Sequence, residues 1–287
     1  MNDKNSFDNF ALDLFRTCPR KYFWRIEKGY TPREPSPPLL WGQMWHLALQ
    51  SYYEMKMKNG DPEVAHDVAI SLVQEKYDSV CRPWDDKRRT KDMLLKALDA
   101  YIQLFGDEPY KPSQVEVGFA IELARIIYTG RIDLILVDVN GSPIVVDFKH
   151  TSMYIGSAYL KQFELDNQIT GYSLACMELM GLKNPPDCIL RIAGLSQKDV
   201  LTKGPLIVGQ MVARGHKQIV EFKQDVFMLA RNINNCMIEE VWPKYTISCT
   251  KWNTICPYFD LCWLGLDKED AEKIFDVSFW EPYKEEV

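Results

Sequence analysis

The chain has 287 residues, of which 46% are hydrophobic and 26% are charged, which is ample apolar material for one large domain or two small ones. With 34 Lys and Arg against 40 Asp and Glu the net charge is −6, so no overall basic field marks a nucleic-acid binder, although metal ions and local basic patches can serve an acidic protein. No apolar run approaches the ~20 residues of a membrane span, and the start "MNDKNSFDNF" lacks the apolar core of a signal sequence, so we expect an intracellular, cytoplasmic protein with no membrane partner.

The first 110 residues are predicted to be helical. Apolar residues recur at three- and four-residue steps in four segments that we expect to be helices: 7–28, 39–58, 62–80 and 86–105. A proline-rich connector, "TPREPSPP" at 31–38, separates the first two helices, and "CRPWDDKRR" at 81–89 has the character of a loop.

The pattern changes to strands from Gln114 onward. In chain order we expect a meander of three strands (114–123, 130–139 and 143–152), a helix (160–181), two strands (188–197 and 205–214) and a long helix (216–240). Helices before and after one mixed sheet predict an α/β fold in a single domain over 1–287. Its parts are a helical N-terminal region (1–110), a sheet core (111–215) and a C-terminal helix with a cysteine-rich segment (216–287).

The third strand, "PIVVDFKHTS", carries two charged residues directly after an apolar run. Side chains alternate along a strand, so Asp147 and Lys149 share one face and Phe148 takes the other. This face is either the place of a local ion pair or part of a catalytic site at the end of the strand.

The turn at residues 139–141 decides what lies opposite Asp147. A two-residue loop over 140–141 would pair Asp133 with Phe148. A three-residue loop would instead pair Asp133 with Asp147, and it would put Gly141 at the left-handed position that this loop type needs. We therefore predict the three-residue loop.

Two carboxylates opposite each other destabilise a sheet, so a cation should lie between Asp133 and Asp147. Lys149 alone could serve, which would be a purely structural arrangement. A divalent metal ion is the other candidate, because hard cations prefer carboxylate oxygens. Geometry alone leaves both interpretations open.

The spacing Asp133…Asp147-Phe148-Lys149 resembles the D…(D/E)-x-K motif of the PD-(D/E)XK nuclease superfamily. Further segments resemble its RecB-like members in the same chain order, over roughly residues 8 to 263: "CPRKYFWRI", "WGQMWH" with Gly42 and His46, "GRIDLIL", "NQITGY" with Gln168 and Tyr172 as a Q-x-x-x-Y motif, and a cysteine cluster. The fold implied is a restriction-endonuclease-like core, a mixed central sheet flanked by helices.

The resemblance implies a role for each matching residue. Asp133, Asp147, Lys149, Gln168 and Tyr172 would be catalytic, and Mg²⁺ or Mn²⁺ would be held by His46, Asp133, Asp147 and the backbone carbonyl of Phe148. Imidazole suits manganese better than magnesium. Glu116 is either a further acidic ligand or an ordinary solvent-facing strand residue. Arg20 and Lys21, with Gln168 and Tyr172, are the residues we expect to contact DNA.

Four of the eight cysteines resemble the iron–sulfur staple of RecB-like nucleases: Cys18, Cys249, Cys256 and Cys262. Four thiolates can hold a [4Fe–4S] cluster or close a tetrahedral Zn²⁺ site. Six residues separate Cys249 from Cys256 where the family usually has two, so zinc stays an alternative.

The resemblance implies a metal-dependent deoxyribonuclease, an exonuclease acting on single-stranded DNA or DNA ends in recombination, repair or phage genome metabolism. The sequence has no helicase motif, so a helicase or recombination partner would do any unwinding. Three alternatives are open: a non-catalytic nucleic-acid-binding or scaffold protein that keeps the fold, a zinc-stapled RNA-processing protein, and a DNA-trimming nuclease of the CRISPR-adaptation type.

Overall fold

A computed structural model describes residues 6–81, 86–123, 125–196, 200–251 and 254–280. These residues form two compact units. One is built from the described residues within 6–35, 120–130 and 220–280, the other from those within 36–119 and 131–219. The expectation of a single domain stays a prediction. Among the described helices, none combines the length and apolar character needed to cross a membrane.

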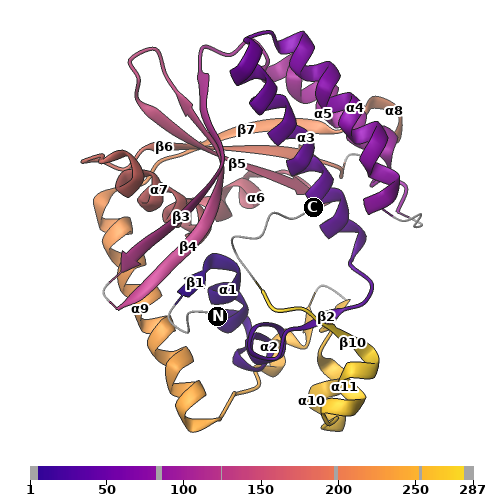
Figure 1. Ribbon diagram of the computed structural model, residues 1–287, viewed down its shortest axis with the longest axis vertical. Helices are drawn as coiled ribbons and strands as arrows, with labels where there is room; N and C mark the ends of the chain where they lie inside the picture. The colour runs from indigo at the N-terminus through magenta and orange to yellow at the C-terminus, as the bar shows by residue number, and fades with distance from the viewer. Residues whose placement is uncertain (1–5, 82–85, 124, 197–199, 252–253, 281–287) are drawn as a thin grey trace. The chain divides into compact units, whose positions relative to one another are not determined.

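The central element is a mixed sheet in the order β1-β4-β5-β6-β7, with β3 also paired to β4 (Figure 1). Its strands are β1 (Ser6–Asp8), β3 (Lys111–Leu123), β4 (Ile126–Val137), β5 (Pro143–Thr151), β6 (Asp187–Gly194) and β7 (Leu206–Val212). β5 runs parallel to β6, which the chain reaches through helices on one face of the sheet, whereas β4–β5 and β6–β7 are antiparallel. The predicted meander and the α/β fold class, a mixed central sheet flanked by helices, are thereby confirmed.

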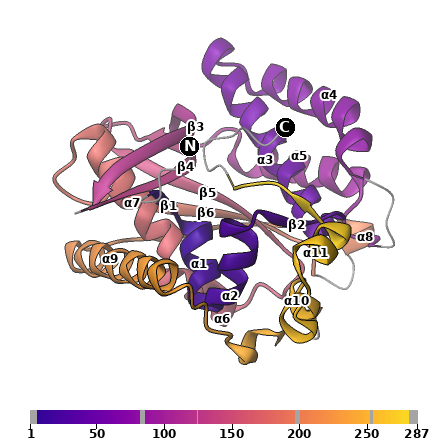
Figure 2. The same cartoon turned by 60° about the horizontal axis from the view of Figure 1, so that its bottom comes forward.

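Two small ladders complete the strands. β2 (Tyr30–Pro32) pairs with β10 (Phe275–Val277), and β8 (Thr250–Lys251) pairs with β9 (Thr254–Ile255). Two short helices, α10 (Phe259–Leu264) and α11 (Lys268–Ile274), lie between β9 and β10 in the chain, and Figure 2 shows α11 beside β2.

Three of the predicted helices form close to their expected bounds: α3 (Pro37–Asn59), α4 (Pro62–Val80) and α9 (His216–Glu239). Helix α5 (Lys91–Phe105) begins five residues later than predicted, because the Thr90 hydroxyl accepts from the Met93 amide and caps its first turn. Part of the predicted loop before it, residues 82–85, lies outside the described residues.

The predicted helix over 7–28 is wrong in its continuity. It is divided into α1 (Asn9–Thr17), α2 (Pro19–Tyr22) and a π-helical turn, Phe23–Glu27. Cys18 is extended (φ −169°, ψ 116°), since the proline that follows disfavours the helical region for the residue before it.

The predicted helix over 160–181 is also divided, into α6 (Ser157–Lys161), a 3₁₀ turn (Gln162–Leu165) and α7 (Asn167–Met180). Asp166 is extended and its carboxylate accepts from the Ile169 amide, so it caps α7 instead of continuing the earlier helix. β6 ends at Gly194, and residue 197, the predicted end of that strand, is not among the described residues.

The hairpin between β4 and β5 has the predicted three-residue loop. Val137 pairs with Pro143, the Asp138 amide donates to the Ser142 carbonyl at 3.0 Å, and Gly141 is left-handed with φ 80°. Extending the ladder by one residue beyond Leu134↔Val146 puts Asp133 opposite Asp147.

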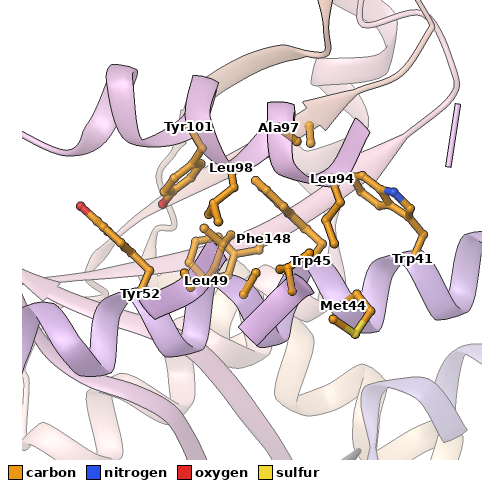
Figure 3. Close-up of a cluster of buried hydrophobic side chains, with 14 of the residues drawn as sticks. Trp41, Met44, Trp45, Leu49, Tyr52, Leu94, Ala97, Leu98, Tyr101 and Phe148 are labelled. Atoms are coloured by element: carbon orange, nitrogen blue, oxygen red, sulfur yellow. The ribbon is translucent and has the colours of Figure 1, made fainter. Parts of the chain in front are cut away.

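The main core of the second unit lies between this sheet and helices α3, α4 and α5. Figure 3 shows Phe148 of β5 among side chains of α3 and α5, including Tyr101. Val146 and Phe148 are buried there, and because side chains alternate, Asp147 and Lys149 face the other side of the sheet. There Lys149 hydrogen-bonds a residue of α7, so α7 covers the face opposite α3.

Candidate active site

Asp147 and Lys149 form a buried ion pair at the end of β5. The Lys149 Nζ lies 2.8 Å from Asp147 Oδ1, and the Asp147 side chain is only 4% exposed. The second oxygen, Asp147 Oδ2, is buried and accepts no hydrogen bond from the described protein atoms. A buried carboxylate oxygen without a donor is costly, so this oxygen favours a cation or a donor that the described protein atoms do not supply.

Asp133 is held beside this pair by the backbone. Its Oδ2 accepts from the Phe148 amide at 2.7 Å, a bond that fixes the carboxylate against β5. Burial raises the pKa of Asp133 to about 6, although Lys149 and the Phe148 amide act in the opposite direction. Burial also raises the pKa of Asp147 to about 6, with the neighbouring Asp133 charge adding to the rise.

Lys149 stays charged between them. Burial alone would lower its pKa, but the carboxylates of Asp147 and Asp133 outweigh that effect and raise it. The site thus holds two carboxylates that are reluctant to ionise together and one ammonium group that is firmly protonated.

A second group of ligand atoms surrounds Asp133. His46 of α3, Glu116 of β3 and Asp133 of β4 each offer an oxygen or nitrogen within 4.8 Å of the other two. His46 Nδ1 is 3.6 Å from Asp133 Oδ2. Within the described parts of the chain this is the only cluster of three such groups. Helix α3 and two strands therefore bring together one imidazole and two carboxylates.

Glu116 reaches this cluster because β3 is irregular at that residue. Its backbone is left-handed (φ 50°), which is rare for a residue other than glycine. In a regular strand Val115 and Phe119 would share a face, but Val115 packs in the core beneath α3–α5 while Phe119 contacts Tyr172 of α7. One extra residue, as in a β-bulge, accounts for the change of face. Backbone strain of this kind is often found where a side chain serves a site.

Gln168 and Tyr172 of α7 extend the chain of polar contacts. Lys149 Nζ donates to Gln168 Oε1 at 2.6 Å, and Gln168 Nε2 donates to the Tyr172 hydroxyl at 2.8 Å. Gln168 thus orients the ammonium group toward Asp147 and is itself oriented by the phenol. The structure therefore brings the residues of the Q-x-x-x-Y motif to the charged pair of β5.

The arrangement fits a divalent cation. The donors are carboxylate oxygens and one imidazole, the set that suits Mg²⁺ or Mn²⁺. The donorless Asp147 Oδ2 and the raised pKa of both aspartates show that the buried negative charge lacks sufficient compensation. When bound, such an ion would polarise a phosphate oxygen and lower the pKa of a water molecule. The remaining expected ligand, the Phe148 carbonyl, lies on β5 next to Asp147.

Gly42 allows α3 to approach β5 closely enough for His46 to join the cluster. A Cβ at position 42 would lie 2.6 Å from Cε1 of His150, closer than real atoms approach. Burial lowers the pKa of His150 to about 4, so its ring is neutral at physiological pH and packs against Trp41. Gly42 and His46 are one helical turn apart, so the glycine sets the height of the histidine above the sheet.

The four cysteines of the expected cluster all belong to the other unit. The Cys256 amide donates to the Cys249 carbonyl at 2.8 Å and so extends the β8–β9 pairing. Cys18 Sγ accepts from the Tyr245 amide and Cys262 Sγ accepts from the Trp24 indole, each at 3.4 Å. Among the described residues, no three of these thiols lie within 4.8 Å of one another.

The expected DNA contacts Arg20 and Lys21 lie beside these cysteines. Arg20 Nε donates to the Trp242 carbonyl at 2.8 Å, so part of its guanidinium holds the chain together. Burial raises the pKa of Cys256, and the charge of Lys21 opposes that rise, which puts the ammonium group near the thiol. Their contact with DNA stays a prediction.

Sequence reasoning missed Arg131, which lies 3.5 Å from Glu116 and whose charge opposes the rise in the pKa of Asp133. A signal for it exists in the sequence, because Arg131 and Asp133 are two residues apart on one strand and must share a face. It balances part of the negative charge that Glu116 brings to the cluster.

Comparison with known proteins identifies a family and solved structures of similar fold. The sequence model of the PD-(D/E)XK nuclease superfamily matches residues 10–263 and, with the mixed sheet, confirms the expected restriction-endonuclease-like core. A solved structure of a protein from Eubacterium rectale, provisionally named an exonuclease, is 14% identical, with 92% of this chain and 90% of that chain covered and a TM-score of 0.53. The structure of SSO0001 is 17% identical over 80% of this chain and 78% of that chain, and its TM-score of 0.33 supports no argument. No curated protein matches the sequence.

Proposed function

The chain belongs to the PD-(D/E)XK nuclease superfamily, and we propose that it is a divalent-metal-dependent deoxyribonuclease that hydrolyses phosphodiester bonds in single-stranded DNA or at DNA ends. The observation that carries the proposal is the buried Asp133, Asp147 and Lys149 set, with His46 and Glu116 beside it. A site that no longer cleaved would have no reason to keep two carboxylates whose ionisation burial opposes.

Each residue has a distinct part in this proposal. Asp147, Asp133, His46 and the Phe148 carbonyl would hold the cation, with Glu116 as a further ligand. Lys149 would orient the attacking water or offset the negative charge that develops on a phosphate oxygen in the transition state. Gln168 and Tyr172 would keep the ammonium group of Lys149 in place, which their 2.6 and 2.8 Å hydrogen bonds support.

For the four cysteines we propose a [4Fe–4S] cluster, with Zn²⁺ as the alternative. A tetrahedral zinc site, with bonds of about 2.3 Å, needs four thiolates about 3.8 Å apart, and no three of the described thiols lie within 4.8 Å of one another. The N–H donors to Cys18 and Cys262 also support a cluster, since such hydrogen bonds tune iron–sulfur centres. Its role would be structural, joining the α1–α2 segment to the C-terminal segment.

The process is proposed on the same basis. A nuclease of this superfamily without helicase motifs would serve recombination, repair or phage genome metabolism together with a helicase or recombination partner. The exonuclease name of the Eubacterium rectale protein favours action on ends, although that likeness concerns the fold.

The test is a cleavage assay on end-labelled single- and double-stranded DNA, with Mg²⁺, with Mn²⁺ and with chelator. Wild type should cut only with metal, and Lys149→Ala should lose at least 100-fold in rate (roughly the share of a well-placed electrostatic donor), measured at a temperature at which circular dichroism shows both proteins to be folded. Lys58→Ala, which removes an exposed lysine near the end of α3, is the matched control and should cut like wild type. Absence of cutting by folded wild type under every condition would favour the non-catalytic, DNA-binding alternative.

A further inference from the structure

The loop that follows β5, residues 152–156, displays an aromatic ring to solvent a few residues beyond the charged pair in the chain. Tyr154 is 82% exposed and its neighbour Met153 is 53% exposed. Tyr154 is five residues beyond Lys149, so the two Cα atoms can be no more than about 18 Å apart. A single exposed apolar residue is ordinary on a protein surface, and exposure by itself would carry no inference.

This loop, however, is firmly held. The Met153 amide donates to the Thr151 hydroxyl at 2.9 Å, and Arg89 Nη2 donates to the Ser152 hydroxyl at 3.1 Å. Ile155 packs so closely on β6 that a Cβ at Gly194 would meet its Cδ1 at 2.6 Å. The loop is therefore anchored on both sides of the tyrosine.

The ring of Tyr154 is itself supported. It lies over Gly156, where an added Cβ would come within 2.9 Å of ring atom Cε1, and the Gly156 amide donates to the Tyr154 carbonyl at 3.1 Å. One side of the ring thus rests on backbone, while most of the side chain stays in contact with solvent. Tyrosine has only two rotatable side-chain bonds, so a supported ring loses little entropy when it binds another flat group.

Tyr159 of α6, just beyond the loop, lies near the charged pair. Burial raises its pKa, and the charges of Lys149 and Asp147 are close enough to modify that shift. The segment between Thr151 and Tyr159 is therefore within reach of a DNA strand whose phosphate is bound at Lys149. Single-stranded DNA presents unpaired bases along this path, and bases stack on aromatic side chains whatever their sequence.

We propose that Tyr154 is a base-stacking platform for single-stranded DNA, which fixes the strand relative to Asp147 and Lys149. The proposal rests on the proposed function and deepens it, because it gives the site a preference for unpaired substrate. In a duplex the bases are already stacked on each other, so the same ring offers duplex DNA little.

The test measures binding of a short fluorescein-labelled single strand by anisotropy, with Ca²⁺ in place of Mg²⁺, by the full chain. Stacking on one aromatic residue predicts that Tyr154→Ala weakens binding about 5- to 150-fold, whereas Tyr154→Phe, which keeps the ring, stays within about twofold of wild type. Leu165→Ala is the matched control, because Leu165 is 83% exposed but has no aromatic face. It should bind like wild type.

A second set of substrates isolates the stacking contact. One abasic nucleotide is moved along the strand position by position. Wild type should lose affinity at one or two neighbouring positions, and Tyr154→Ala should be insensitive to the abasic nucleotide at those same positions. A general effect on folding would weaken all substrates alike and would not remove the sensitivity at selected positions.

Three results would overturn the proposal: equal binding by Tyr154→Ala and wild type, equal loss in Tyr154→Phe and Tyr154→Ala, or failure of wild type to bind the single strand. The nuclease proposal is judged separately by cleavage with and without Lys149. If the Tyr154→Ala variant cuts single-stranded DNA with unchanged KM and kcat, the nuclease proposal stands and the base-stacking proposal is wrong.

Discussion

Substitution of Gly42 by alanine tests how the close approach of α3 to β5 builds the site. Two opposed effects act on the free energy of unfolding. Alanine within a helix is favoured over glycine by about 1 kcal/mol. Against this, the new Cβ would lie 2.6 Å from Cε1 of His150, a ring already packed on Trp41. Overpacking of this kind costs about 1–3 kcal/mol, so Gly42→Ala should destabilise the protein by up to about 2 kcal/mol.

The sign of the effect should depend on His150. In a His150→Ala background the obstructing ring is gone, and the same Gly42→Ala change should stabilise the protein by up to about 1 kcal/mol. Urea unfolding of the four proteins measures this coupling. If Gly42→Ala has the same effect with and without the ring, the steric explanation is wrong.

The function should follow the geometry. His46 lies one turn beyond Gly42 on α3, and its Nδ1 is 3.6 Å from Asp133 Oδ2. A helix pushed away from β5 carries His46 out of the cluster. Mn²⁺ affinity, measured by calorimetry, should therefore fall in Gly42→Ala and recover in the double variant with His150→Ala. Unchanged Mn²⁺ affinity in all variants would remove His46 from the proposed ligands.

Three further predictions concern groups elsewhere in the molecule. Arg191 is fully buried and bonded to a carboxylate and two phenols, so Arg191→Met should destabilise the protein by about 3–5 kcal/mol in urea unfolding, because it leaves that carboxylate buried without its partner. The pKa of Asp133 and of Asp147 is raised to about 6 in the folded protein, so their protonation stabilises the metal-free protein below pH 4. This stabilisation should be lost as the pH rises through about 6. Thermal melts in chelator should show the loss, and it should be smaller in Asp147→Asn. Cys256→Ser should lose bound iron or zinc, by metal analysis of protein prepared without oxygen, together with much of the stability, whereas Cys236→Ser should keep both.

The sequence predicts those parts of the fold in which a few neighbouring residues determine the backbone conformation. The β4–β5 register is predicted from Gly141, because a three-residue loop needs a left-handed backbone at its last residue and glycine adopts one without strain. The breaks in the two helices were not predicted, because the helical spacing of apolar residues continues across a break of one residue. Cys18 is buried on the same face as Tyr22, so the spacing conceals the interruption that Pro19 enforces. Asp166 likewise occupies a position that a continuous helix would allow on its surface.

The site likewise contains residues that the sequence can bring together and residues that it cannot. Asp133, Asp147 and Lys149 share a face by strand alternation and register, so sequence can bring them together. The side toward which Glu116 faces could not be predicted, because it depends on an irregularity in β3 that no residue type in the strand indicates. Tyr154 was missed for a different reason. Its significance lies in the packing of Ile155 and Gly156 around it, which is a tertiary property.

The balance of charge around Asp133 gives the strongest physical reason for a cation at this site. Three carboxylates meet here, and two of them have a cationic side chain close by: Glu116 with Arg131 at 3.5 Å and Asp147 with Lys149 at 2.8 Å. Asp133 lies between these pairs with a backbone amide at 2.7 Å and an imidazole at 3.6 Å. Three negative charges and two positive ones leave one negative charge, in a place where burial already raises the pKa. A divalent cation would balance that charge, and the donorless oxygen of Asp147 would be one more oxygen available to it.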